Sequence, residues 1–109
     1  MEATQAWYAF QNANTAGENV TWNTQGDTLA LQVFGDATSV SLQVFGQVDT
    51  LSNTWVVLNA LNVSTLQTAT TIAGKGIFFV PVDGLGQIKI KLVSVSGGKI
   101  SVFGRITRG

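Results

Sequence analysis

Apolar and polar residues alternate with a period of two along much of the chain, and the spacing typical of an α-helix is nearly missing. Segments 28–34, 40–45 and 87–92 show the alternation most clearly, because Leu, Val or Ile occupies every second position in each of them. This period is that of a β-strand with one buried face. The pattern therefore predicts an all-β protein.

Turn-forming residues separate the strands predicted in this way. Residues 35–39 (Gly-Asp-Ala-Thr-Ser) lie between the first two strands and predict that these two form a hairpin. The dipeptide Gly97-Gly98 is typical of a hairpin turn and precedes a final predicted strand over 99–106. At 93–95 the apolar positions shift by one residue, which predicts a β-bulge.

Three further strands are predicted over 19–23, 55–58 and 77–82. Residues 59–71 have no clear period, and we expect either a short strand near 63–66 or an irregular crossover there. About seven or eight strands spaced by turn signals are typical of an antiparallel β-sandwich or jelly roll.

The length of 109 residues suits a single domain, and we assign the β-sandwich to residues 19–109. Residues 1–18 differ from the rest: residues 4–10 are aromatic and compatible with a strand, but 11–18 are rich in Asn, Ala, Thr and Gly without a period. We expect an N-terminal arm here, which is either loose or docks Trp7, Tyr8 and Phe10 on a neighbouring subunit.

Charged residues make up only 11% of the chain, and six basic residues balance six acidic ones. A nucleic-acid partner is not expected, because phosphate binding needs a surplus of clustered basic residues. No apolar run approaches the length that spans a membrane, so no membrane partner is expected either. A surface with so few charges and no net charge is poorly protected against association, which favours a protein partner.

Several kinds of chemistry are excluded by residue type. The chain has no His and no Cys, which rules out Ser–His and Cys–His nucleophiles, His or Cys zinc sites, and disulfides. The six carboxylates are scattered and mostly fall at predicted turns: Glu2, Glu18, Asp27, Asp36, Asp49 and Asp83. We therefore expect no catalytic residues, no cofactor and no metal, and we expect the protein not to be an enzyme. Residues 1–5 lack the basic start of a signal peptide, so synthesis in a cytosol is expected.

A five-residue repeat identifies a candidate interface. Leu-Gln-Val-Phe-Gly at 31–35 recurs at 42–46, and Val-Phe-Gly recurs at 102–104. If Leu and Val point inward, Phe34, Phe45 and Phe103 share the outer side with Gln and Ser. These rings either cap strand ends beneath loops or form an exposed patch, which usually marks an interface.

Two tryptophans and a group of cations are further candidates for binding. Trp55 lies in an apolar strand and is predicted to belong to the core. Trp22, between Thr21 and Asn23, is the better candidate for a flat platform that binds a glycan. Four cations on the last two strands are interpreted as a solvated face or a mild basic stripe: Lys89, Lys91, Lys99 and Arg105.

Strands and turns follow a distinctive order in the second half of the chain. The segments are Val-Phe-Gly-Gln-Val-Asp (44–49), Asn-Thr-Trp-Val-Val-Leu (53–58), Ile-Ala-Gly-Lys-Gly-Ile (72–77), Val-Pro-Val-Asp-Gly-Leu (80–85), Ile-Lys-Ile (88–90) and Ser-Gly-Gly-Lys-Ile-Ser-Val-Phe-Gly-Arg (96–105). A strand ending in Gly leads to a turn with Asp, then to Asn-Thr-Trp and a short apolar strand, and this order resembles that of small virion proteins of tailed bacteriophages. The match covers roughly residues 28–108 and contains no catalytic motif.

Proteins of this group are head decoration (cement) proteins, head fibres or tail modules, and they are often trimeric. The resemblance implies a structural virion protein, made in the host cytoplasm, that forms a homotrimer. A decoration protein would bind the major capsid protein or another virion protein and stabilise the head. Phe34, Phe45 and Phe103 are the candidates for the subunit contact, and Trp7, Tyr8 and Phe10 for docking on the capsid. The alternative is a carbohydrate-binding or receptor-binding module of a phage tail or baseplate that uses Trp22.

Overall fold

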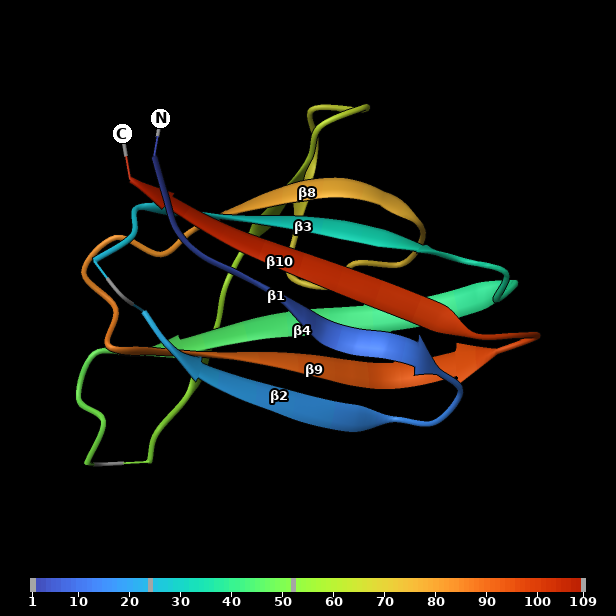
Figure 1. Ribbon diagram of the computed structural model, residues 1–109, viewed down its shortest axis with the longest axis horizontal. Coiled ribbons are helices and arrows are strands. Elements are labelled where there is room, and N and C mark those ends of the chain that lie inside the picture. Colours follow the sequence, from blue (N-terminus) through green and yellow to red (C-terminus); the bar gives the residue numbers. More distant parts are fainter. Residues whose placement is uncertain (1, 24, 52, 109) are drawn as a thin grey trace.

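Two antiparallel sheets packed face to face make up the computed structural model, which describes residues 2–23, 25–51 and 53–108, with side chains from residue 5 onward (Figure 1). The six-stranded sheet has the order β1 (Glu2–Ala13), β10 (Ile100–Arg108), β3 (Thr28–Gly35), β8 (Gly76–Pro81), β6 (Ala60–Asn62) and β7 (Thr68–Ala69). The four-stranded sheet has the order β2 (Gly17–Trp22), β9 (Gln87–Ser96), β4 (Ser39–Gln47) and β5 (Val56–Val57). The predicted all-β sandwich is confirmed.

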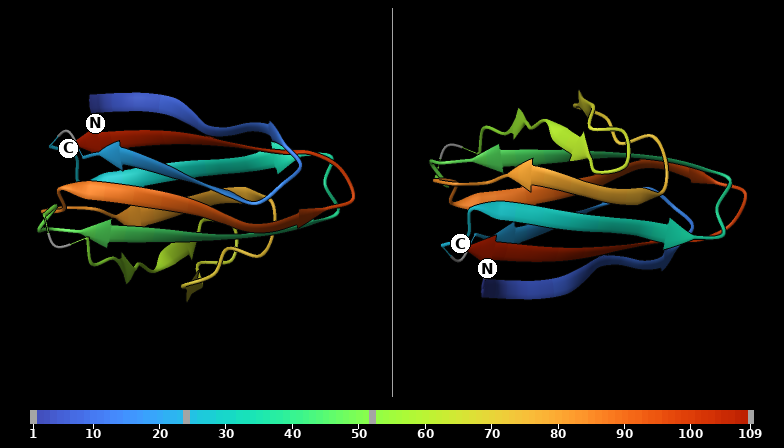
Figure 2. Two further views of the ribbon diagram at one scale, coloured as in Figure 1. Left: turned by 90° about the horizontal axis from the view of Figure 1, so that it is seen from below. Right: turned by 90° about the horizontal axis from the view of Figure 1, so that it is seen from above.

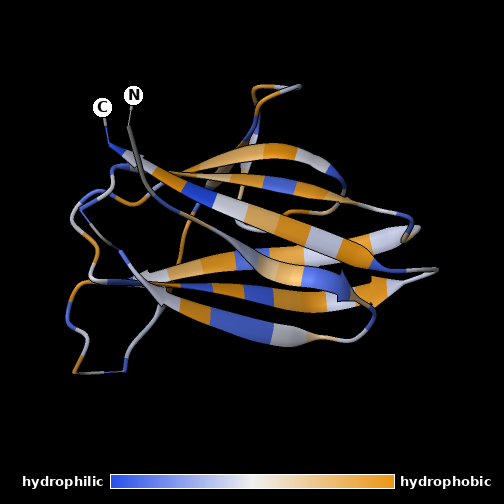
Figure 3. Cartoon of the chain, in the orientation of Figure 1, coloured by the Kyte–Doolittle hydropathy of each residue, from blue (hydrophilic) through white to orange (hydrophobic). Residues whose placement is uncertain are grey.

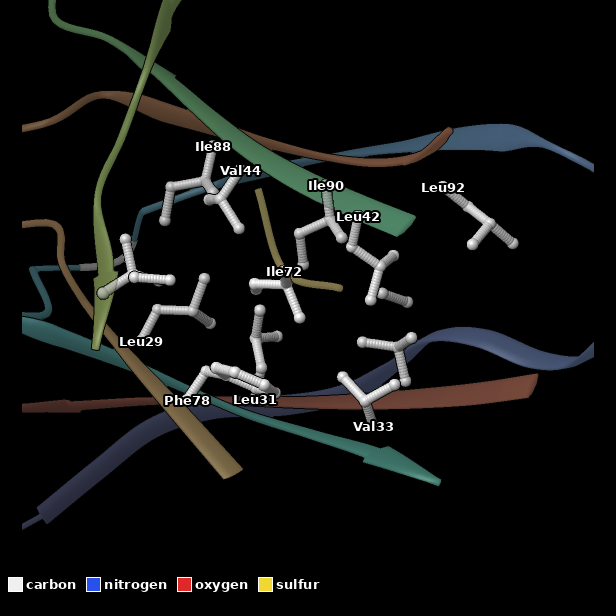
Figure 4. Packing of buried hydrophobic residues seen from close by; sticks show 14 of the residues in the cluster. Leu29, Leu31, Val33, Leu42, Val44, Ile72, Phe78, Ile88, Ile90 and Leu92 are labelled. Carbon is white, nitrogen blue, oxygen red and sulfur yellow. The ribbon is translucent and has the colours of Figure 1, made fainter. Parts of the chain in front are cut away.

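The core lies between the two sheets, and the alternation of each long strand decides which residues enter it (Figure 3). Leu31 and Val33 of β3 face Leu42 and Val44 of β4 across the sandwich, and each is at most 2% exposed (Figure 4). Ile90 of β9 completes the same layer and is fully buried. Each such side chain contributes about 1.5–3 kcal/mol relative to an exposed one.

The predicted hairpin between 28–34 and 40–45 is wrong. β3 and β4 belong to different sheets, and so do β9 and β10, so both connections cross from one layer to the other. Alternation says which side chains point inward, but it does not say whether the next strand lies alongside or opposite. The two crossings lie side by side at one end of the sandwich, far from the strand ends near the termini (Figure 2).

Backbone hydrogen bonds join these two crossings. The N–H groups of Asp36 and Ala37 both donate to the carbonyl of Lys99, each over 3.1 Å. In return, the Lys99 N–H donates to Asp36 Oδ1 over 2.7 Å. Gly35 lies so close that a Cβ there would clash with the Lys99 carbonyl oxygen, and its φ of 137° suits glycine alone.

The loose arm expected at the N-terminus is wrong for the residues that the structure describes there, because 2–13 form β1 and 17–18 begin β2. β1 pairs with β10 along its length, and β2 begins at Gly17. The sequence indicated only a possible strand over 4–10 and not the whole of β1, because register shifts between Ala3/Gln5, Tyr8/Phe10 and Phe10/Ala13 break its period. At the last of these, Asn12 has a φ of 52° and its N–H donates to Ser101 Oγ.

Residues 56–72 carry the chain from the four-stranded sheet to the six-stranded one. Of the two alternatives expected for 59–71, the strand near 63–66 is wrong, because a turn follows β6 there, whereas a crossover between the sheets is present. Leu42 exchanges two backbone hydrogen bonds with Ile72, of 2.9 and 2.8 Å, so this segment covers the free edge of β4. The bulge predicted at 93–95 is confirmed, because the β4–β9 register shifts where Val93 is the extra residue.

The close contact between the two crossings predicts that Gly35→Ala strongly lowers the stability of the fold. The methyl group meets the Lys99 carbonyl and the backbone leaves its preferred region, so we expect a loss of about 2–4 kcal/mol in the free energy of unfolding, measured in urea. Gly74→Ala is the matched control, because nothing lies within 4 Å of its added Cβ. We expect it to change stability by less than about 0.5 kcal/mol, and equal effects of both variants would contradict this contact.

Candidate functional site

The outer face of the six-stranded sheet carries a group of mostly apolar side chains that also includes Gln32 and Arg105. The strand registers place Tyr8, Phe103, Gln32 and Ile77 in one row across the sheet, and Arg105, Ala30 and Phe79 in the next. Phe34 lies beside Ser101 in the row on the other side. We call this surface the front face: Tyr8, Ala30, Gln32, Phe34, Ile77, Phe79, Phe103 and Arg105.

The front face leaves large apolar side chains in contact with solvent. Tyr8 is 46% exposed, Ile77 45%, Phe79 41% and Phe34 38%. Isolated exposed apolar residues are normal in small domains, but a contiguous group that covers several strands marks an interaction surface. The front face is therefore our candidate site.

An aromatic cluster fixes one end of the front face. The Tyr8 ring meets Phe103 edge-on with a centroid separation of 5.0 Å and lies 6.4 Å from Phe34. Such pairs contribute about 0.5–1.5 kcal/mol beyond burial, and they hold the rings in place before any partner arrives. A rigid aromatic surface loses little conformational entropy when it binds.

A hollow lies beside this cluster because Ala30 is small. Its neighbours on either side are longer, so the surface sinks between Arg105 of β10 and Phe79 of β8. Two adjoining depressions of about 350 and 240 Å³ share Ala30 and Arg105 in their lining. A flat apolar face with a recess is suited to receiving a projecting side chain of a partner.

The three repeated phenylalanines all point away from the core, but they do not form one patch. Phe34 and Phe103 lie on the front face, whereas Phe45 lies on the outside of the four-stranded sheet. There Lys89 Nζ is 5.2 Å from the centroid of the Phe45 ring and 4.9 Å from that of Trp55. The prediction that Trp55 belongs to the core is therefore wrong, because its ring packs against the Lys89 side chain on the outer surface.

The proposed docking residues divide between the inside and the outside of β1. Trp7 points inward, packs against the core and donates through Nε1 to Asn19 Oδ1 over 3.0 Å. Phe10 also packs against the core, because the register shift after Tyr8 returns it to the inner side. Of the three, Tyr8 alone contributes to the front face.

Trp22 is 62% exposed at the end of β2, on the outside of the four-stranded sheet. Its cross-strand neighbour is Gln87, whose side chain accepts a 2.7 Å hydrogen bond from Gln47. The β4–β5 register continues this row toward Trp55. The Trp22 ring thus has the exposure and the amide neighbours expected of a platform residue.

Ile77 and Phe79 were missed by the sequence reasoning. The run Ile-Phe-Phe-Val at 77–80 is apolar at every position, so it does not say which side chains face solvent. Pro81 predicts either an edge position or the last part of its strand; β8 lies between β3 and β6, and Pro81 is its last residue, so the second alternative is confirmed. The even-numbered residues enter the core and the odd-numbered ones enlarge the front face.

Two features are absent from the described residues. No group of three or more Asp or Glu side chains gathers there in a way that could hold a metal ion. Within the same part of the chain, no helix is long and apolar enough to cross a membrane.

Fold and site together define a small β-sandwich with one exposed apolar sheet face. The sequence model of the XepA family matches residues 5–106, and the chain belongs to this family. A search of curated proteins finds no match.

Two solved structures share the fold. The SPBc2 prophage-derived protein YomS has 17% sequence identity and a TM-score of 0.84, and the match covers 94% of this chain and 90% of that one. The PBSX exported protein XepA has 21% identity and a TM-score of 0.86, and the match covers 94% of this chain and 37% of that one. The chain thus spans a little over a third of the length of that XepA structure.

The inward position of Trp7 predicts that Asn19→Ala destabilises the fold. The change leaves the indole N–H without its acceptor, so we expect a loss of about 1–2 kcal/mol in the free energy of unfolding in urea. Val20→Thr, at the next position, keeps a β-branched side chain at a site that is 50% exposed. We expect this control to change stability by less than about 0.5 kcal/mol, and a neutral Asn19 variant would contradict the assigned hydrogen bond.

Proposed function

We propose that the chain is a structural protein of a phage assembly and acts through protein–protein contact at the front face. The exposed apolar side chains of that face carry this proposal. Membership of the XepA family and the fold shared with two prophage proteins support the phage association. The scarcity of charge agrees with a surface that is covered by protein in the working state.

In its more specific form, the proposal is a capsid decoration protein that forms a homotrimer. Its partners are other copies of the chain and the major capsid protein or another virion protein, and its location is the virion. A stable interface buries roughly 800 Å² on each partner, and the chain has 5914 Å² of accessible surface from which to supply it. Binding to the folded state alone would stabilise both the chain and the particle by mass action.

The front face predicts which substitutions abolish association. Phe34→Ser and Phe79→Ser remove apolar area from exposed positions, so we expect light scattering after size exclusion to find a trimer for the natural chain and a monomer for these variants. Truncation of a central interface residue costs about 2 kcal/mol or more in binding, which is roughly a thirtyfold loss of affinity. The same variants should no longer sediment with phage particles.

Phe45→Ser is the matched control, because it removes the same ring from the opposite sheet. We expect this variant to associate and sediment like the natural chain. A monomeric natural chain that also fails to sediment with particles would overturn the proposal, as would association that is indifferent to both front-face changes.

A carbohydrate-binding or receptor-binding module is the second candidate, and the exposure of Trp22 favours it. Sugars stack on flat aromatic rings, and Gln87, the cross-strand neighbour of Trp22, offers the NH2 group of its amide for a hydrogen bond, whereas Gln47 is buried and donates to Gln87. Under this candidate function, Trp22→Ala should lower affinity for a glycan found on an array by about tenfold or more, in line with the loss of a central aromatic contact. Val56→Ala, an exposed apolar position at 61%, is the control. No binding to any glycan would remove this candidate.

A further inference from the structure

Arg105 is the one charged residue among the outward-facing residues of β10, β3 and β8. Its side chain is exposed and makes no hydrogen bond or ion pair with any residue that the structure describes. It lines both depressions of the front face. A guanidinium within an apolar surface is costly to cover unless the covering partner supplies an anion.

Two hydroxyl groups line the larger depression with Arg105. Thr107 follows Arg105 by two residues on β10, and the register pairs it with Thr28 of β3. Neither Thr side chain has a hydrogen-bond partner among the described residues. Ala30 and Phe79 complete the lining with apolar surface. Three polar groups and an apolar wall therefore converge on one hollow.

We infer that this hollow binds a carboxylate carried by an apolar protein segment, which is the Asp or Glu side chain of the partner that covers the front face. The guanidinium offers two parallel N–H donors to a carboxylate, the Thr hydroxyls offer further donors, and Ala30 and Phe79 receive the apolar neighbours of the acid. The inference rests on the proposed function, because it names the chemistry that a protein needs in order to cover this face.

The position of Arg105 also selects against some partners. Two copies packed front face to front face about a two-fold axis close to Arg105 would bring two guanidinium groups together, and like charges there oppose binding. A partner that is apolar throughout would bury the guanidinium unpaired. The face thus accepts a different surface that brings an acid, and it rejects a copy of itself in that orientation.

Titration of the ¹⁵N-labelled chain with hexanoate tests the site. The readout is the NMR chemical shift of the Arg105 Nε–Hε signal and of the backbone amides of β3 and β8. Hexanoate combines a carboxylate with an apolar tail, and for a ligand of its size we expect a dissociation constant of about 1–10 mM. Hexanamide has the same shape without the charge, and acetate has the charge without the tail. Both should bind about tenfold more weakly or not at all.

Arg105→Gln should abolish the hexanoate shifts, and Thr28→Val should weaken binding severalfold. Arg108→Gln is the matched control, because it removes the same charge from the same strand at a residue that donates to Gln25 instead. We expect it to bind hexanoate like the natural chain. Equal shifts with hexanamide, or hexanoate shifts that persist in Arg105→Gln, would overturn the inference.

The same samples separate this inference from the proposed function. Association that is lost in Phe34→Ser, together with no binding of hexanoate, overturns the carboxylate site and leaves the proposed function standing. Hexanoate binding by a chain that neither self-associates nor sediments with particles overturns the proposed function, and with it the protein origin of the carboxylate. Loss of association in Arg105→Gln but not in Arg108→Gln supports both.

Discussion

Mutual coverage of two inward-facing sets of Leu, Val and Ile is the constraint on which the rest of this molecule depends. The inner side of each sheet is apolar, so each sheet must bury that side against the other. The chain meets this need by crossing between layers repeatedly, so that β1 and β2, β2 and β3, β3 and β4, β8 and β9, and β9 and β10 lie in different sheets. Because the side chains of a strand alternate between its two faces, every other side chain of the long strands points outward. The front face consists of the side chains that this alternation directs outward from the six-stranded sheet.

The sequence predicted side-chain direction better than strand partnership. The inward positions of β3, β4 and β9 followed from their period, and so did the bulge at Val93. The crossing between sheets at 35–38 could not be predicted, because a turn between strands has the same composition whether the strands lie side by side or face to face. Nor could the whole of β1, because its extra residues remove the period that reveals a strand. A local pattern predicts which side chains of one strand point inward, but the pairing of strands depends on contacts between residues far apart in the sequence.

Only part of the candidate site could be predicted from the sequence, for the same reason. Phe34 and Phe103 follow Val in a clear alternation, so their outward direction could be read from the chain. That Phe45 lies on the opposite sheet depends on the crossing between the strands, and that Ile77 joins the front face depends on β8 pairing with β3. Trp55 was misplaced because an apolar strand is expected to be buried, whereas this ring is covered by the aliphatic and charged parts of Lys89.

β1 has a long edge that no strand covers, since it ends the six-stranded sheet. A straight edge of this kind is a template for another chain and leads to open-ended polymers. The register shifts that hid part of β1 from sequence analysis also bend and twist it, and Asn12 turns one amide back toward Ser101. An incoming strand meets an edge whose hydrogen-bonding groups are out of step with its own. Such an edge is poorly suited to strand addition from another copy, so under the proposed function it is the broad front face, not the edge of β1, through which the protein contacts its partners.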